Sequence, residues 1–309
     1  MSKEEQAPGL VSIIMPAFNR GHCLGRAIGS VINQTYNHWE LIIVDNNSTD
    51  DTDNVVSSFG DARIKLLKIN NHGVIAASRN LGLDAASGEF VAFLDSDDWW
   101  LREKLSVSVD CLNNGADIIY HDLYLASSYP AKTKFYKKTK SRPLNGNVYL
   151  ELIRRGNALV TSSVVTRLRL FKQINGFSEE KALIAAEDFD AWLRLSKLTD
   201  NFTQIEEPLG FYWWGSGNSD TPERVIKKFE FFVQRYAEDL EKICANEYPA
   251  WLAYILCRAY YRLRNYDKAK HFVRKVFLGS PTPIIFMKTV ITYISIALFS
   301  NWSGKVFTD

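Results

Sequence analysis

Apolar runs and polar loops alternate regularly through the amino-terminal third of the chain. Three short runs rich in β-branched residues, 10–18, 39–45 and 63–69, each lead into a polar loop. Between them, apolar residues recur every three or four positions, as they do along one face of a helix. A fourth apolar run, 89–95, follows the alanine-rich stretch 74–86. This alternation predicts βαβ units and a mostly parallel sheet flanked by helices.

The pattern changes near residue 220, where the apolar positions begin to follow the helical period alone. The first such stripe is formed by Val225, Ile226, Phe229, Phe232, Tyr236, Leu240 and Ile243. We therefore expect an α/β domain over residues 8–220 and an all-helical extension over residues 221–309.

Residues 281–300 are the most apolar stretch of the chain and contain a single charge, at Lys288. Thr289, Thr292 and Ser295 share a helical face with this lysine, and Ile, Phe, Val and Leu cover the rest. The apolar part is slightly shorter than a membrane-spanning helix requires. Two alternatives fit: a helix that lies in the membrane interface, or a buried helix that closes the helical extension.

The composition excludes several classes of protein. The 309 residues are 46% hydrophobic and 23% charged, as is usual for a globular protein. A net charge of +2 gives no support to nucleic-acid binding. None of the four cysteines stands in a CxxC pair, which argues against a disulfide framework or a zinc site. Because the first residues lack an apolar signal segment, we expect a cytoplasmic protein, or one on the cytoplasmic face of a membrane.

Three aspartates, Asp95, Asp97 and Asp98, follow the fourth apolar run within four positions. Like charges about 4 Å apart repel by about 1 kcal/mol even in water, so the cluster suggests a cation that relieves the repulsion. Carboxylate oxygens at a strand end suit Mg²⁺ or Mn²⁺, although an acidic turn after a strand is the simpler alternative. Ligands of parallel sheets bind at the carboxyl ends of the strands, so Asp45 should face the same crevice.

Five segments of the chain form a recognisable series: VSIIMPAFNR, ELIIVDNNSTDDT, NHGVIAASRNLGLDAASGEFVAFLDSDD, NGF and AEDFDAWLRL. In order and spacing, over roughly residues 10–215, the series resembles glycosyltransferase family 2, whose members have the GT-A fold. The resemblance implies an inverting enzyme that moves a sugar from a nucleotide-diphosphate donor, expected to be a UDP-sugar, to an acceptor hydroxyl. Synthesis of a cell-surface polysaccharide or glycolipid is the expected context.

The resemblance also implies where the nucleotide binds. Asp45 matches the aspartate that accepts a hydrogen bond from the base, and Ala17 and Phe18 match positions whose backbone approaches the nucleotide. Arg79 resembles an arginine near the nucleotide and the diphosphate. Without the resemblance, Asp45 would be interpreted as a loop acid capping the next helix, and Arg79 as a surface residue.

The remaining implied roles fall on two acidic motifs. Asp95 matches the first aspartate of a DxD motif, near the ribose, and Ser96 follows it in the donor site. Asp97 matches the second, which holds Mn²⁺ or Mg²⁺, with Asp95 as a further ligand. Asp188 matches the catalytic base, and Glu187 stands beside it. The alternative for this pair is that acids stabilise the start of a helix.

One segment departs from the family pattern. Many members carry a histidine that completes the metal site, but the matching stretch 211–220 contains none. Either Asn218 or Asp220 supplies a ligand instead, or the metal keeps an extra water. Trp213 and Trp214 are candidates to stack on a sugar, with two core tryptophans as the alternative.

Two other functions remain open, and the partners follow from the resemblance. A protein of this fold that binds a nucleotide-sugar or a glycan without turnover is one alternative. A nucleotidyltransferase is a weaker one, because PAFNRGHCLG is a poor triphosphate loop. The expected partners are a UDP-sugar donor, a glycan or lipid-linked glycan acceptor and, through residues 281–300, a membrane surface; nucleic acid is not expected.

Overall fold

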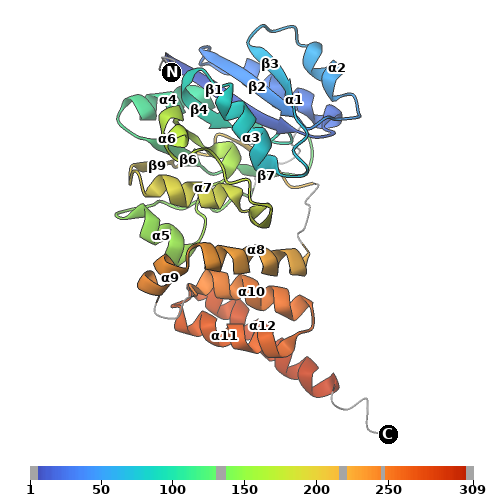
Figure 1. Cartoon of the computed structure of the whole chain (residues 1–309), viewed down its shortest axis with the longest axis vertical. Coiled ribbons are helices and arrows are strands. Elements are labelled where there is room, and N and C mark those ends of the chain that lie inside the picture. Colours follow the sequence, from blue (N-terminus) through green and yellow to red (C-terminus); the bar gives the residue numbers. More distant parts are fainter. Residues whose placement is uncertain (1–5, 130–136, 216–220, 245–247, 304–309) are drawn as a thin grey trace. The chain divides into compact units, whose positions relative to one another are not determined.

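The computed structural model describes residues 6–129, 137–215, 221–244 and 248–303 (Figure 1). The chain divides into two compact units, which we call the α/β unit and the helical unit. The α/β unit comprises Met1–Val148 and Ala158–Gly217, and the helical unit comprises Tyr149–Asn157 and Asn218–Asp309. The helical unit therefore includes a short segment that precedes the last part of the α/β unit in the sequence.

A seven-stranded sheet forms the centre of the α/β unit. In spatial order its strands are β3 (Ile64–Lys68), β2 (Trp39–Asp45), β1 (Ala7–Ala17), β4 (Gly88–Phe93), β8 (Val165–Arg167), β6 (Ile118–His121) and β9 (Phe202–Ile205). Only β8 runs antiparallel to its neighbours. Every residue of β2 is buried, as expected for a strand with helices on both faces of its sheet. The predicted α/β fold with a mostly parallel sheet is confirmed.

Helices flank this sheet (Figure 1). They are α1 (Gly21–Ile32), α2 (Thr52–Ser57), α3 (Ile75–Asp84), α4 (Lys104–Asn113), α6 (Leu168–Gln173) and α7 (Glu187–Ser196). Helix α3 packs closely on β1, because a Cβ atom placed on Gly82 would lie only 2.6 Å from Cγ2 of Ile14. This contact brings Arg79 of α3 against the central strands.

A second, three-stranded sheet follows the aspartate cluster. Its strands are, in spatial order, β5 (Trp99–Trp100), β10 (Gly210–Trp213) and β7 (Tyr124–Ala126). The rings of Trp99 and Phe211 stack with their centroids 4.9 Å apart, which fixes β10 against the residues that directly follow the cluster.

The helical unit consists of α5 (Val148–Arg155), α8 (Pro222–Arg235), α9 (Ala237–Ile243), α10 (Ala250–Arg262), α11 (Tyr266–Leu278) and α12 (Pro283–Ser303). The first residue of α5, Val148, is still counted with the α/β unit. Helices α8, α10 and α11 stack as a layer of neighbouring rods (Figure 1). Nε1 of Trp251 donates a hydrogen bond of 2.9 Å to the Ile153 carbonyl, which ties α5 to α10. The predicted helical character of this region is confirmed.

Helix α12 packs through a face that carries Thr289, Thr292 and Ile296, whereas Lys288 is exposed. Thr289 and Thr292 are buried, and their hydroxyls donate to the carbonyls of Ile285 and Lys288 one turn earlier, which leaves their methyl groups for packing. Most of its large apolar side chains are exposed instead: Ile284, Phe286, Met287, Ile291, Tyr293, Ile294 and Leu298. Within the described part of the chain, no helix is both long enough and apolar enough to cross a bilayer.

Candidate active site

The carboxyl ends of β1, β2 and β4 form one edge of the large sheet. Ala17, the last residue of β1, pairs with Asp45, the last residue of β2. On the other side of β1, the Leu94 amide donates to the Ile14 carbonyl at 3.1 Å and leads the chain into the aspartate cluster. The structure therefore places Asp45 and the cluster at the same edge, as expected for parallel strands.

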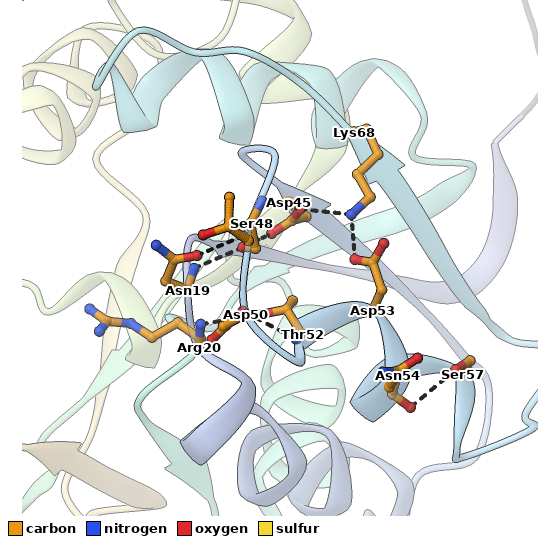
Figure 2. Close-up of polar contacts among 11 residues, drawn as sticks. Asn19, Arg20, Asp45, Ser48, Asp50, Thr52, Asp53, Asn54, Ser57 and Lys68 are labelled. Carbon is orange, nitrogen blue, oxygen red and sulfur yellow. Dashed lines mark hydrogen bonds and ion pairs between the residues drawn. The ribbon is translucent and has the colours of Figure 1, made fainter.

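The Asp45 carboxylate is fully buried and held by its own loop and by the neighbouring strand (Figure 2). Its Oδ2 accepts hydrogen bonds from the Ser48 amide at 2.8 Å and from Nζ of Lys68 at 2.9 Å, and its Oδ1 accepts from the Ser48 hydroxyl. A carboxylate oxygen can accept two hydrogen bonds, so Oδ1 keeps the capacity for one more donor.

Asp50, rather than Asp45, satisfies the helix ends nearby (Figure 2). Its carboxylate accepts from the amide of Gly21, which begins α1, at 2.9 Å, and from that of Thr52, which begins α2, at 3.1 Å. The hydrogen bonds from Thr52 and from the Gly21 amide lower the pKa of Asp50 overall, although burial opposes them. Asp45 is therefore not needed as a helix cap.

The loop after β1 lies against the loop after β2 (Figure 2). The Asn19 amide donates to Oγ of Ser48 at 2.8 Å, and Oδ1 of Asn19 accepts from the Thr49 amide at 2.9 Å. Ala17 is buried, whereas the Phe18 side chain is 54% exposed. An exposed aromatic ring at a rigid strand end is suited to contact a ligand.

The three aspartates of the cluster differ in their surroundings. Asp98 is buried and accepts a hydrogen bond of 2.8 Å from the Trp213 amide, so it holds β10 in place. The side chains of Asp95 and Asp97 are 30% and 27% exposed. Burial, followed by the charge of Asp95, raises the pKa of Asp97, and the same two effects raise that of Asp98. Asp97 also lies 3.6 Å from Nη2 of Arg20.

The donor set at this edge fits a divalent cation that is bound jointly with a phosphate ligand. Mg²⁺-type sites commonly use one or two carboxylates together with substrate phosphates. Asp95 and Asp97 supply two partly exposed carboxylates, and the charge of Asp95 is one of the causes that raise the pKa of Asp97, after burial. Among the described residues no three acidic, histidine or cysteine side chains converge as a cluster that would hold a metal alone.

Arg79 is buried and joins the two acidic motifs. Its Nη2 donates to Oδ1 of Asp95 at 2.9 Å, and its Nη1 donates to Oε1 of Glu187 at 2.7 Å. Burial alone would lower the pKa of Arg79, but the charges of Asp95 and Glu187 raise it overall. This arginine is therefore not a surface residue; it links α3, the aspartate cluster and the start of α7.

Asp188 lies next to this ion-pair network. Its Oδ2 accepts a hydrogen bond of 3.1 Å from the Thr161 hydroxyl, in a short 3₁₀ helix, Thr161–Ser163. Burial, and then the charge of Glu187, raises the pKa of Asp188 to about 6. A carboxylate with such a pKa is a better proton acceptor near neutral pH than an ordinary aspartate.

Four residues of the site were not predicted from the sequence. Thr161 contacts Asp188, and the Ser162 hydroxyl accepts the Asp95 amide hydrogen at 3.1 Å, so the 3₁₀ helix supports both acidic motifs. Arg20 lies at Asp97, and Arg26 donates to the Asp97 carbonyl. The TSS triplet in ALVTSSVVT gave no signal, because it sits inside an apolar, β-branched run.

The two tryptophans of β10 and its following loop have different surroundings. The Arg26 guanidinium lies 4.7 Å from the ring centroid of Trp213 and 4.0 Å from that of Trp99. Trp213 therefore packs on an arginine, whereas Trp214 is 67% exposed. Asn218 and Asp220, the alternative metal ligands, lie outside the described residues. The individual roles expected for the site residues stay predictions.

Comparison with known proteins agrees with this geometry. A family model described as glycosyl transferase family 2 matches residues 12–173. The chain is 35% identical, over 189 residues, to the UDP-Glc:alpha-D-GlcNAc-diphosphoundecaprenol beta-1,3-glucosyltransferase WfgD of Escherichia coli. That match covers 61% of this chain and 70% of WfgD.

Two solved structures show the same fold. Staphylococcus aureus TarS 1–349, solved with UDP-GlcNAc, has a TM-score of 0.59 at 18% identity, covering 96% of this chain and 93% of TarS 1–349. The mannosyltransferase PcManGT of Pyrobaculum calidifontis, solved with GDP-Man and Mn²⁺, has a TM-score of 0.56 at 17% identity. Here the match covers 96% of this chain and 87% of PcManGT. The predicted GT-A fold is thereby confirmed.

Proposed function

The chain belongs to glycosyltransferase family 2, and on that premise we propose that it moves a sugar from a UDP-sugar to a hydroxyl of a lipid-linked glycan, with inversion. The relative WfgD is described as using UDP-Glc and a diphosphoundecaprenol-linked acceptor, and TarS was solved with UDP-GlcNAc. These descriptions favour a UDP donor and an acceptor carried on a lipid diphosphate. The product then belongs to a cell-surface polysaccharide or glycolipid.

The observation that carries the proposal is the Asp188 carboxylate, whose pKa of about 6 suits a general base. Asp188 takes the proton of the acceptor hydroxyl while the hydroxyl oxygen attacks the anomeric carbon. The bond from that carbon to the diphosphate breaks, and UDP leaves. Because the attack occurs from the face opposite the leaving group, the anomeric configuration inverts. Thr161 holds Asp188 through its hydrogen bond.

The proposed donor site uses the other residues of the sheet edge. We assign Asp45 to the N–H of the uracil, and Ala17 and Phe18 to the lining of the nucleotide. Asp95 and Ser96 lie toward the ribose. Arg79 acts by fixing Asp95 and by balancing the charge of Glu187, since its guanidinium is already bound to both acids.

We assign Asp97 and Asp95 as ligands of Mn²⁺ or Mg²⁺. When bound, the cation would neutralise charge on the diphosphate and on the leaving group. PcManGT, a protein of the same fold, was solved with Mn²⁺. Arg20, which lies 3.6 Å from Asp97, keeps a permanent positive charge beside the same carboxylate.

We also propose that the enzyme works on the cytoplasmic face of a membrane, in contact with it through residues 281–300. The supporting observation is the apolar side of α12, on which Ile284, Met287 and Ile291 are exposed. Apolar side chains on one side of a helix bind the interface between lipid headgroups and acyl chains.

The proposed function is tested by turnover and binding measured on the same protein. We expect release of UDP from a UDP-sugar when Mn²⁺ and a lipid-diphosphate-linked N-acetylhexosamine are supplied, and NMR of the product reports the anomeric configuration. Asp188→Asn should lower kcat by about 10²–10⁴-fold, the usual contribution of a general base, with UDP binding retained in calorimetry. Asp97→Ala should weaken the Mn²⁺-dependent part of UDP binding.

Two outcomes would contradict the proposal. If the wild-type protein bound UDP-sugars but released no UDP with any acceptor, the non-catalytic binding protein would be the better description. If Asp188→Asn kept full activity, the proton would have another acceptor, and the assigned base would be wrong.

A further inference from the structure

The helical unit contains a cavity of about 580 Å³ that plays no part in the proposed chemistry. It is lined by Arg154 and Arg155 at the end of α5, by Tyr248 before α10, and by Leu278, Ser280 and Thr282 between α11 and α12. All of these residues belong to the helical unit. The volume is within the range of cavities that hold small ligands.

The cavity has a net positive charge, because its lining contains two arginines, Arg154 and Arg155, and one acid, Glu151. Arg155 is bound to Glu151 at 3.2 Å, with about half of its side chain exposed. Arg154 is exposed, and among the described residues it has no hydrogen-bond or ion-pair partner. An arginine without an internal partner presents its full set of N–H donors to a ligand, and their planar geometry matches the oxygens of a phosphate.

The cavity is continuous with an apolar surface. Leu278 lines the cavity and is also 62% exposed, and its neighbour Phe277 is exposed beside it. The Phe277 ring packs on Phe286 of α12 with the centroids 5.4 Å apart. The exposed apolar side of α12 begins there, only two residues after Thr282, with Ile284 and Met287. Cationic and apolar surfaces are thus joined over a few residues.

We propose that this cavity binds the phosphate of a membrane lipid headgroup while the apolar side of α12 lies in the membrane interface. The arginines recognise the phosphate, and Leu278 and α12 contact the acyl region. The inference extends the proposed function, since an enzyme for a lipid-linked acceptor must reach the membrane, but it assigns a separate binding site. Charge complementarity at Arg154 and the continuous apolar surface together favour an anionic amphiphile over a soluble anion.

Arg154→Glu is the sharpest variant, because Arg154 has no partner in the described chain whose loss would weaken the fold. The matched control is Arg262→Glu, an equal charge reversal at an exposed position. Arg262 ends α10, about 18 Å along that helix from the end near the cavity. If only the overall charge of the protein attracts it to the membrane, both variants should weaken vesicle binding equally. If the cavity is a specific site, only Arg154→Glu should weaken it strongly.

The measurement is flotation of the full-length protein with vesicles of phosphatidylcholine alone or mixed with phosphatidylglycerol. We expect binding to favour the mixed vesicles, Arg154→Glu to lower that partition about tenfold or more, and Arg262→Glu to lower it less than about threefold. Equal losses in the two variants would overturn the inference. So would full competition by millimolar inorganic phosphate, which would indicate a site for the free anion.

Turnover separates this inference from the proposed function. With a water-soluble acceptor, Arg154→Glu should transfer sugar as fast as the wild-type protein, because the cavity is not part of the catalytic residues. Loss of vesicle binding with turnover intact supports the lipid site. If the protein showed no turnover but the two variants still differed on vesicles, the lipid site would stand and the enzymatic proposal would fall.

Discussion

The surroundings of Asp188 make its charged form unfavourable for folding, and the same surroundings make its carboxylate a better proton acceptor. Burial and the neighbouring Glu187 disfavour the ionised form. The charge of Arg79, the Phe189 amide and the Thr161 hydroxyl favour it, and the balance is a pKa of about 6. A surface aspartate, with an ordinary pKa, would be a weaker base. Partly buried carboxylates whose pKa is raised in this way are typical of active sites.

The raised pKa of Asp188 predicts that activity is lost on the acidic side of its pH profile. Only the deprotonated Asp188 accepts a proton, so kcat/KM should fall tenfold per pH unit below about pH 6. Thr161→Val removes a hydrogen bond that stabilises the charged form, so it should move this limit to higher pH. Thr166→Val, whose hydroxyl bonds the Asp117 carbonyl instead, is the control. A limit that stays in place in Thr161→Val would show that another group titrates.

The same residue predicts a gain in stability when it is neutralised. The pKa of Asp188 rises from 3.8 to about 6 on folding, so its favourable contribution is complete below pH 3.8 and is lost as the pH rises through 6. Asp188→Asn removes the charge and should raise the free energy of unfolding at pH 8 by about 1–3 kcal/mol. Urea unfolding at pH 8 and pH 4 tests this, since the difference should be much smaller at pH 4.

At the level of single residues, the sequence identifies the acids but not their partners. Asp95 and Glu187 stand out by their motifs, whereas Arg79 looks like one more charged residue of an alanine-rich helix. Its bond to Glu187 spans 108 positions, and nothing local in the sequence records such a contact. The environment that sets a pKa depends on these partners, so it becomes visible only in the folded chain.

The elements of the α/β unit show how a site is held by close packing. Helix α3 lies on β1 where Gly82 leaves room for Ile14, and this approach positions Arg79 one turn earlier on the same helix. The central strands were predictable, because four short apolar runs that are separated by helical patterns and polar loops are typical of buried strands in a parallel sheet. The three-stranded sheet was not, since two of its strands are two or three residues long and too short to show a period.

Two glycines in helices should respond in opposite ways to alanine. Gly82→Ala would place a Cβ 2.6 Å from Cγ2 of Ile14, push α3 away from β1 and lower stability by about 1–3 kcal/mol. Gly29 in α1 has no atom within 4 Å of the same position, so Gly29→Ala should raise stability by about 0.5–1 kcal/mol. Denaturant unfolding of both variants measures this. A stabilised Gly82→Ala would show that α3 is less closely packed than described.

For helix α12, the sequence predicts two different sides but not which of them packs inward. The alternation of threonines and apolar residues predicts an amphipathic helix, and the usual expectation is that the apolar side packs inward. The structure instead buries Thr289 and Thr292 together with Ile296 and leaves most of the large apolar side chains exposed. The two threonines can be buried because they satisfy their hydroxyls within the helix and pack as small side chains. The direction in which a helix faces depends on its neighbours, which its own pattern does not specify.

At the scale of the whole molecule, the proposed donor contacts all lie in the α/β unit. Amide hydrogen exchange with and without UDP and Mn²⁺ should therefore show protection near residues 17–19, 45–48 and 95–98. Residues 221–244 and 248–303 should exchange at unchanged rates, because no proposed donor contact lies there. Protection that appeared in α10 or α11 would mean that the donor also acts on the helical unit, contrary to the present assignment.

The placement of α5 has a consequence for how the chain folds during synthesis. Ile153 bonds to Trp251, which is made 98 residues later. At ribosomal rates of about 5–20 residues per second, α5 waits roughly 5–20 s for its native cover, with Leu152 and Ile153 available to wrong partners. During synthesis the α/β unit is therefore accompanied by an uncovered amphipathic helix, α5. A fragment ending near residue 220 would leave α5 uncovered permanently, so truncation there should favour aggregation over a soluble catalytic domain.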